Sequence, residues 1–167
     1  MKAKATMKFS MKTKGLDNLR RRIRSASSHV SKVGFWNGTS NDGEMSIASL
    51  AFLQEYGRPQ TAIHNFIPAR PFFRMSAMNV VNGRSDVRHY MKVALQQIIS
   101  GKQTTQHSFQ MVGQVYEDEL KAIITYFDEP PNAARTEAMK GKDDPLVDSG
   151  HMRDSVQNKV TKRGVDV

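Results

Sequence analysis

The stretch LAFLQEYGRPQTAIHNFIPARPFFRMSAM, residues 50–78, decides how this chain folds. It predicts a helix, a break, an irregular connection and a second helix. Gly57 is placed to end the first helix in a left-handed conformation, and Pro59 keeps that helix from resuming because proline lacks a backbone N–H. The first helix is expected to have an apolar side formed by Leu50, Phe52 and Leu53.

A proline on each side of Arg70 predicts a stiff approach to the second helix. Pro68 and Pro71 push the residues before them toward extended geometry, and Pro71 also suits the first turn of a helix. The result is a rigid elbow with a cation at its corner. We expect Arg70 to pair across the elbow with Glu55 or a carbonyl, or to reach an acidic group on an adjacent protomer. The residues expected to anchor the second helix in the core are Phe72, Phe73 and Met75.

The residues around this elbow resemble a known protein family. Glu55-Tyr56-Gly57, a polar gap and then IPARPFF at residues 67–73 are similar to a signature of small neck proteins of tailed bacteriophages. These are tail-completion or head–tail joining proteins. The segment PLVDSGHMRDSV, residues 145–156, resembles the turn, short helix and final strand with which the same proteins close. The residues that the resemblance assigns to the elbow or to a subunit interface are Glu55, Tyr56, Gly57, Arg70, Pro71 and Phe72.

The resemblance implies a structural virion protein, without enzymatic activity or cofactor. Such a protein forms a homo-oligomeric, hexameric ring at the neck, which completes the tail and joins it to the head. Its expected partners are the connector or head-completion protein and the tail tube or tail terminator protein. A tail terminator or a connector adaptor within the same neck assembly is an equally open role, as is the type of tail. We expect assembly in the host cytoplasm and residence in the neck or tail of the virion.

Composition restricts the other classes of protein to which this chain can belong. Its 167 residues suit one domain with a real core. The chain has no cysteine, which excludes disulfides, cysteine-ligated metals and a thiol nucleophile. No apolar run reaches the roughly 18 residues that a membrane span requires, and no apolar segment typical of a secretory signal follows the basic N-terminus. We therefore expect no contact with a membrane.

The net charge of +9 lies at one end of the chain. Residues 1–32 hold ten Lys or Arg and one acidic residue, whereas residues 33–167 hold equal numbers of both. The arginines at positions 20–24 form a solvated helix face, contact phosphate, or pair with acidic groups on a neighbouring subunit. In a ring, this end can line the lumen and contact genomic DNA non-specifically. The residues expected there are Lys2, Lys4, Arg20, Arg21, Arg22 and Arg24.

A second class of function follows from the same charge. A stand-alone nucleic-acid-binding protein could act through the basic segment 1–32, with most of its affinity coming from phosphate contacts. Against this interpretation, the aromatic residues are not interleaved with the basic ones, and no helix-turn-helix or RNA-recognition signature is visible.

The resemblance, together with the individual helices and strands that hydrophobic periodicity indicates, implies a single α+β domain, with a small antiparallel or mixed sheet of about four strands packed against two to four helices. Residues 1–14 are expected to be a basic arm and first strand, 15–127 the α+β core, 128–149 an extended polar loop, and 150–167 a short helix and C-terminal strand. Within the core, a helix from Leu16 to about Ser25 carries the apolar stripe Leu16, Leu19 and Ile23. The strongest helix runs from Thr104 or Thr105 to about Phe127, with Glu117, Asp118, Glu119 and Lys121 on its solvent side.

No arrangement of residues predicts catalysis. The five histidines are scattered, at positions 29, 64, 89, 107 and 151, and no two of them have metal-ligand spacing on one helix. The sequence contains no HExxH, GxSxG or GxGxxG motif. Asp148-Ser149-Gly150-His151 is read as a turn and helix cap, because residues so close in sequence point in different directions. We therefore expect no enzyme, no metal and no cofactor.

Overall fold

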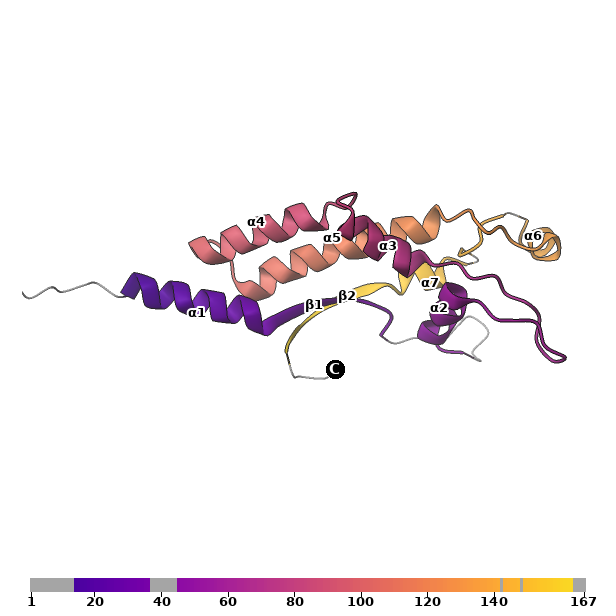
Figure 1. Cartoon of the computed structure of the whole chain (residues 1–167), viewed down its shortest axis with the longest axis horizontal. Helices are drawn as coiled ribbons and strands as arrows, with labels where there is room; N and C mark the ends of the chain where they lie inside the picture. The colour runs from indigo at the N-terminus through magenta and orange to yellow at the C-terminus, as the bar shows by residue number, and fades with distance from the viewer. Residues whose placement is uncertain (1–13, 37–44, 142, 148, 164–167) are drawn as a thin grey trace, which may run out of the picture.

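The computed structural model of this chain describes residues 14–36, 45–141, 143–147 and 149–163, which form an elongated α+β arrangement (Figure 1). The α+β class expected from the sequence is therefore confirmed. In chain order the elements are α1 (Lys14–Ser28), β1 (His29–Gly34), α2 (Ile47–Tyr56), α3 (Phe72–Val81), α4 (Val87–Ser100), α5 (Thr105–Thr125), α6 (Ala134–Lys140), α7 (His151–Asp154) and β2 (Gln157–Lys162).

Helix α5 is the element on which the others pack. It begins after Thr104, whose side-chain oxygen accepts a hydrogen bond from the backbone N–H of His107, as an N-terminal cap does. Apolar residues recur along α5 at helical spacing, so one broad face is buried. This helix contacts α3, α4, α7 and both strands, and Figure 1 shows α4 running beside it. Its buried apolar side chains are Phe109, Val112, Leu120 and Ile124.

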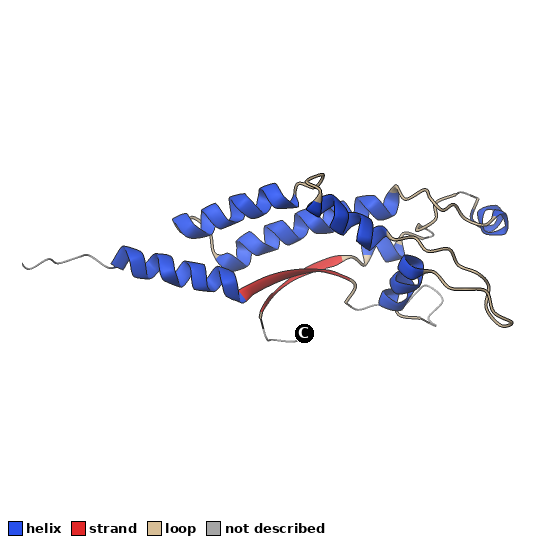
Figure 2. Ribbon diagram, viewed as in Figure 1, coloured by secondary structure: helices blue, strands red, loops and turns tan. Residues whose placement is uncertain are grey.

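The sheet has two strands in the part of the chain that the structure describes, not about four. β1 and β2 pair antiparallel, with His29 opposite Lys162 and Gly34 opposite Gln157 (Figure 2). The strand expected within residues 1–14 and the last residues of the expected C-terminal strand, 164–167, lie outside the described residues. Two strands suffice because α5 covers one face of the ribbon, which would otherwise be only marginally stable in water.

Gly113 allows the sheet to approach α5 closely. A Cβ atom at this position would lie 2.5 Å from the Oγ of Ser31 and 2.9 Å from the Oδ1 of Asn158. A larger residue would therefore displace the side chains of Ser31 and Asn158. The close approach brings side chains of the sheet within hydrogen-bonding distance of α5.

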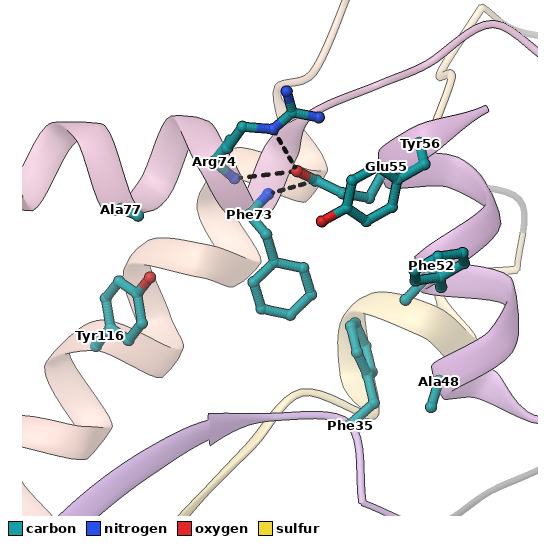
Figure 3. A pocket seen from close by; sticks show the side chains of 10 residues that line it. Phe35, Ala48, Phe52, Glu55, Tyr56, Phe73, Arg74, Ala77 and Tyr116 are labelled. Atoms are coloured by element: carbon teal, nitrogen blue, oxygen red, sulfur yellow. Dashed lines mark hydrogen bonds and ion pairs between the residues drawn. The ribbon is translucent and has the colours of Figure 1, made fainter.

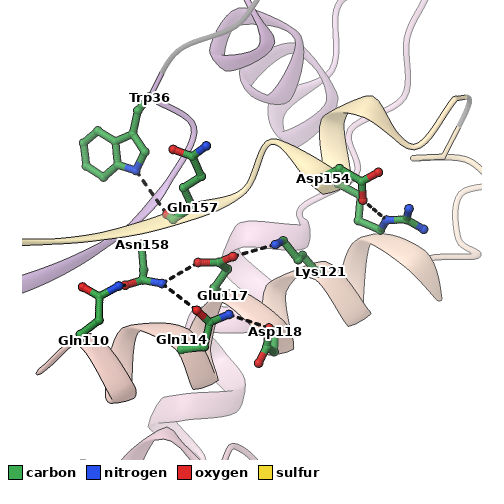
Figure 4. A network of polar contacts seen from close by, with 10 residues as sticks. Trp36, Gln110, Gln114, Glu117, Asp118, Lys121, Asp154, Gln157 and Asn158 are labelled. Atoms are coloured by element: carbon green, nitrogen blue, oxygen red, sulfur yellow. Dashed lines mark hydrogen bonds and ion pairs between the residues drawn. The ribbon is translucent and has the colours of Figure 1, made fainter. Parts of the chain in front are cut away.

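Asn158 joins β2 to α5 (Figure 4). Its Nδ2 donates to Glu117 Oε2 at 2.6 Å, and its Oδ1 accepts from Gln110 Nε2 at 2.6 Å. Lys121 Nζ donates to the other Glu117 oxygen at 2.6 Å. The prediction that Glu117 faces solvent is therefore wrong, since its side chain is buried. The reason is that β2, from the far end of the sequence, covers this side of α5.

The main apolar core lies where α2, α3, α5 and α7 meet. Phe72 is fully buried there, as predicted, whereas Met75 is 46% exposed, contrary to prediction. Met75 is exposed because the buried face of α3 is occupied by Phe72 and Ser76, which lie four residues apart, and Met75 points away from that face. The cluster comprises Ile47, Ala51, Phe72, Leu120, Ile124, Phe127, Leu146, Met152 and Val156.

Helix α2 buries a different side from the one that its apolar residues indicated. Ile47, Ala51 and Glu55 are buried, and their spacing of four places them on one face. Phe52, predicted to lie on the apolar side, is 65% exposed. Ser46 caps the helix through its side-chain oxygen, as expected from its position.

The segment 128–149 contains helix α6, so the expectation of an extended polar loop is wrong for Ala134–Lys140. This helix ends at Gly141, which has a left-handed conformation with φ 72°. The short helix expected near residue 150 is present as α7, and its Met152 and the following Val156 are buried in the core.

Helix α1 is longer than predicted, and its apolar stripe is not buried. None of its residues is buried, and Leu16 and Ile23 are 47% and 50% exposed. The helix contacts α4 and α5 along part of its length. Arg22 Nη1 donates to the carbonyl oxygen of Ile99 at 3.0 Å, near the end of α4. The packing expected for Leu16 and Ile23 is therefore absent from the described part of a single chain.

The hydrogen bonds around Glu117 predict a pH-dependent contribution to stability. Burial alone would raise the pKa of Glu117, but hydrogen bonds from Lys121 and Asn158 outweigh it and hold the pKa below its ordinary value of 4.5. A carboxylate of lowered pKa stabilises the fold above its unfolded pKa, and this contribution is lost as pH falls through the folded pKa. We expect Glu117→Gln to cost about 1–3 kcal/mol at neutral pH and much less at about pH 3.

Urea unfolding of both proteins at several pH values measures this difference. Asp118→Asn provides the control, because it also removes one α5 carboxylate, which is exposed and bonded to Gln114 on the same helix, but not the bonds to Lys121 and Asn158. A stability gap between wild type and Glu117→Gln that is constant across the pH range would contradict the assignment.

Candidate functional site

Glu55 closes the elbow between α2 and α3 (Figure 3). Its buried carboxylate accepts hydrogen bonds from the backbone N–H of Phe73 at 2.9 Å and of Arg74 at 3.3 Å. The Arg74 Nε donates a third, at 3.3 Å. Pro71 occupies the cap position of α3 and provides no side-chain hydrogen bond. A carboxylate from α2 therefore satisfies N–H groups that the first turn of α3 leaves unpaired, and it fixes the direction in which α3 begins.

Arg70 connects the elbow to the segment that follows α5. Its guanidinium is buried and donates to Gln54 Oε1 at 2.8 Å and to the carbonyl oxygens of Pro130 and Pro131, each at 3.2 Å. The predicted pairing with a carbonyl is confirmed, and the predicted alternative of pairing with Glu55 is wrong. Glu55 is unavailable because α3 uses its carboxylate.

The residues that receive Arg70 were missed from the sequence, although one signal was present. Pro130 and Pro131 have no N–H, so this segment cannot pair its backbone regularly and leaves carbonyl oxygens for another donor. Burial lowers the pKa of Arg70, and the carboxylate of Asp143 opposes that shift. The guanidinium stays charged at neutral pH, because the pKa of an arginine lies far above neutrality. Arg70 is thus a structural cation in a single chain.

Gly57 ends α2 at a point where the chain passes close to itself. Its N–H donates to the Leu53 carbonyl, and its φ of 71° is positive, as predicted. Its ψ of −176° differs from that of a left-handed helical residue and lies in a region used almost only by glycine. A Cβ atom here would lie 2.6 Å from the Ile67 carbonyl oxygen and 2.7 Å from the Ala69 nitrogen. Glycine is therefore required at position 57, both for its backbone conformation and for the close approach of the chain at residues 67–69.

Residues 58–67 form an arm between α2 and α3. At its base, the backbone N–H of Arg58 donates to the Ile67 carbonyl at 2.8 Å, and the reverse bond is 2.9 Å. Figure 1 shows the arm extending beyond α2, away from α4 and α5. Ile63 and Phe66 are 84% and 64% exposed on it. The arm therefore presents apolar side chains to the surroundings.

An apolar pocket of about 530 Å³ opens beside the elbow (Figure 3). Phe35 and Phe73 meet edge to face inside it, with ring centroids 5.8 Å apart. Phe52 and Tyr56 are largely exposed at its rim, with centroids 4.7 Å apart, and Arg74 lies over the Tyr56 ring at 5.4 Å. An aromatic pocket with one cation at its edge suits an apolar side chain of a protein partner.

The structure brings the six predicted elbow residues together but gives them different environments. Glu55 and Tyr56 line the pocket, whereas Phe72 lies in the core and Arg70 faces the segment after α5. Pro71 stands at the cap of α3, one residue before the helical position expected for it. Of the six, Tyr56 is the residue whose exposed ring can touch a partner directly.

The arginines predicted to contact DNA all lie on α1, but they differ in how exposed they are. Arg20, Arg21 and Arg24 are exposed, while Arg22 is half-buried against the end of α4. Arg20 Nη1 lies 3.8 Å from Asp17 Oδ1, a weak surface ion pair. The other two predicted contacts, Lys2 and Lys4, lie outside the described residues.

Two further observations concern the described residues alone. No group of three or more acidic or histidine side chains among them is arranged to hold a metal ion. None of the described helices has the length and apolar character needed to cross a membrane.

Gly57→Ala tests the close approach at the elbow. We expect it to destabilise the protein well beyond the roughly 1–2 kcal/mol that a left-handed conformation costs a residue with a Cβ, because that atom would also collide with the backbone at residues 67–69. The measurement is urea unfolding. Gly83→Ala is the matched control, because Gly83 also has φ 71° but nothing lies within 4 Å of the position that a Cβ atom would take there. Equal losses in the two variants would contradict the interpretation.

Arg70→Lys tests the connection between the elbow and the segment after α5. Lysine keeps the charge but lacks the planar fork that reaches three acceptors at once. We expect a loss of about 2–3 kcal/mol and faster proteolysis within residues 128–141, since hydrogen bonds to a charged donor are lost. Arg84→Lys is the control, because Arg84 is exposed. Unchanged proteolysis in Arg70→Lys would show that the segment is held by other contacts.

Comparison with known proteins was made at three levels. No protein-family model, no curated protein and no solved structure matches this chain. Function is therefore inferred from the geometry of the elbow, the arm and the pocket, and from the resemblance carried by residues 55–57, 67–73 and 145–156.

Proposed function

We propose that this chain is a structural virion protein of a tailed bacteriophage, which forms a ring at the neck and joins the completed tail to the head connector. The observation that carries the proposal is the set of large apolar side chains that a single chain leaves exposed. Helix α1 buries no residue, and exposed apolar side chains also occur on the arm, α3 and α6. Surfaces of this kind mark sites of contact between proteins.

The rigid elbow supports the proposal of a ring, because a ring closes only if the angle between neighbouring subunits is constant. A head-to-tail contact closes only if each copy repeats the same rotation. Glu55 and Arg70 fix α2, α3 and the segment after α5 relative to one another through buried hydrogen bonds. The IPARPFF segment that carries the resemblance is the same segment that provides this rigidity.

The proposed partners follow from the place of the ring. One face meets the connector or head-completion protein, and the other meets the tail tube or tail terminator protein. The aromatic pocket beside Tyr56 and the arm with Ile63 and Phe66 are the apolar surfaces available for these contacts. The basic residues of α1 can contact DNA in the lumen. Assembly takes place in the host cytoplasm, and the finished protein resides in the virion.

A nucleic-acid-binding protein is the second candidate function. It is favoured by the exposed Arg20, Arg21 and Arg24 and by Lys159, whose Nζ lies 4.9 Å from the centroid of the Trp36 ring. An aromatic ring beside basic residues suits stacking on a single-stranded base. This interpretation does not explain the exposed apolar side chains at the other end of the molecule.

Mass photometry of the purified protein, alone and with tail tubes of its phage, tests the proposal. We expect a ring in solution, or a monomer that forms a ring when tubes are added, because the apolar surfaces need partners. Tubes of an unrelated phage are the control. A monomer that ignores its own tubes but binds DNA with a steep salt dependence would overturn the proposal and favour the second candidate.

A further inference from the structure

We propose that α1 of one copy docks on the acidic end of the next copy, where the acidic end is the surface formed by Tyr126, Asp128, Glu129, Glu137 and Met139. This docking rests on the proposed ring. It specifies the two surfaces through which neighbouring copies in that ring would contact one another. Neither surface includes the elbow or its pocket.

The first observation is that α1 has no buried residue although it is strongly amphipathic. Leu16 and Ile23 lie on one stripe with Leu19, and the first two are about half exposed. A helix of 15 residues is marginal in water by itself, and its stability in proteins comes mainly from packing of its apolar face. Its contacts with α4 and α5 cover Leu19 in part but leave Leu16 and Ile23 about half exposed, so a further surface is needed to cover these two side chains.

The second observation is charge complementarity between the two surfaces. Arg20, Arg21 and Arg24 are exposed beside the stripe on α1. At the other surface Asp128, Glu129 and Glu137 are exposed, and none of them forms an ion pair with a described residue. Opposite charges that face one another steer association and fix its register.

The acidic end also carries exposed apolar side chains. Tyr126 is 81% exposed at the end of α5, and Met139 is 80% exposed on α6. Each surface therefore combines exposed apolar side chains with exposed charges, which are mainly basic on α1, where Asp17 is the one acidic residue, and acidic at Asp128, Glu129 and Glu137. Burial of Leu16 and Ile23 against Tyr126 and Met139 would supply the apolar core of the contact, with the charged pairs around it.

The arrangement of the molecule makes the contact intermolecular. Figure 1 shows α1 at one extremity of the elongated chain and α6 at the other, so α1 cannot reach the acidic end of its own copy. Two different surfaces on one chain give a head-to-tail contact, which repeats from copy to copy and can close into a ring. A phosphate backbone could pair with the same arginines, but it would leave Leu16 and Ile23 uncovered.

Charge reversal on each surface tests the docking. One variant carries Arg20→Glu and Arg24→Glu, and the other carries Glu129→Lys and Glu137→Lys. We expect each to weaken self-association at least tenfold by sedimentation and mass photometry, with an unchanged circular dichroism spectrum. The combined fourfold variant should recover most of the association, because both charge patterns are then exchanged. Arg84→Glu with Lys92→Glu is the control, since these exposed residues carry the same charge away from both surfaces.

Mixing the two reversed variants gives a sharper result. In the mixture, the intact α1 of one variant can dock on the intact acidic end of the other, and the reversed α1 can dock on the reversed end, so a head-to-tail contact predicts assemblies in which the two variants alternate, although neither variant assembles alone. Because the chain has no cysteine, Arg24→Cys with Glu137→Cys adds a direct readout. A bismaleimide should link copies to one another in this variant and leave either single-cysteine variant with at most dimers.

The outcomes separate this docking from the proposed function. Association of both reversed variants at wild-type strength would overturn the docking and leave the ring to form through other surfaces. A wild-type protein that stays monomeric at high concentration and on its own tail tubes would overturn both. A reversed variant that loses DNA binding while it associates normally would assign the α1 arginines to phosphate contacts instead.

Discussion

The buried carboxylate of Glu55 is the constraint on which the arrangement of α2, α3 and the arm depends. Glu55 belongs to α2, and its carboxylate accepts hydrogen bonds from the first free backbone N–H groups of α3. Pro71, at the start of α3, provides no side-chain cap. This arrangement allows Pro71 to stiffen the approach to α3 without leaving that helix end unpaired. Arg70 then holds the segment after α5 against the same elbow. A few polar contacts therefore fix three parts of the chain that are far apart in sequence.

The distribution of apolar side chains separates the interior of this molecule from its surfaces for assembly. The core lies around α5, where Leu120 and Ile124 are fully buried. Outside it, large apolar side chains are exposed on the body, on α2, α3 and α4, and also on α1, the arm, the end of α5 and α6, which lie toward the extremities of the molecule (Figure 1). The proposed ring would account for that distribution, because a subunit with neighbours on both sides and partners above and below would have four surfaces to cover.

Particular residues show how far the sequence could predict the structure. The sequence predicts the start of α5 at Thr104 and the end of α2 at Gly57, because a cap or a stop depends on bonds within a few residues. Glu117 was placed on the wrong side of α5, since the sequence near it does not reveal that Asn158 arrives from β2. The candidate site is predicted as a segment, and the pairing of Arg70 with carbonyl oxygens is confirmed, but the sequence indicates neither that those oxygens come from the segment after α5 nor that Glu55 binds the start of α3.

The sequence by itself determined the α+β class, the helices of the elbow, the cap residues and the concentration of positive charge at one end. These features depend on local hydrogen bonding, on periodicity and on composition, which a short window contains. Only the tertiary structure decided which face of α2 is buried, that α1 is left without a covering surface, and that its basic face and the acidic end lie at opposite extremities. Those features depend on contacts between distant segments, whose partners no local pattern specifies.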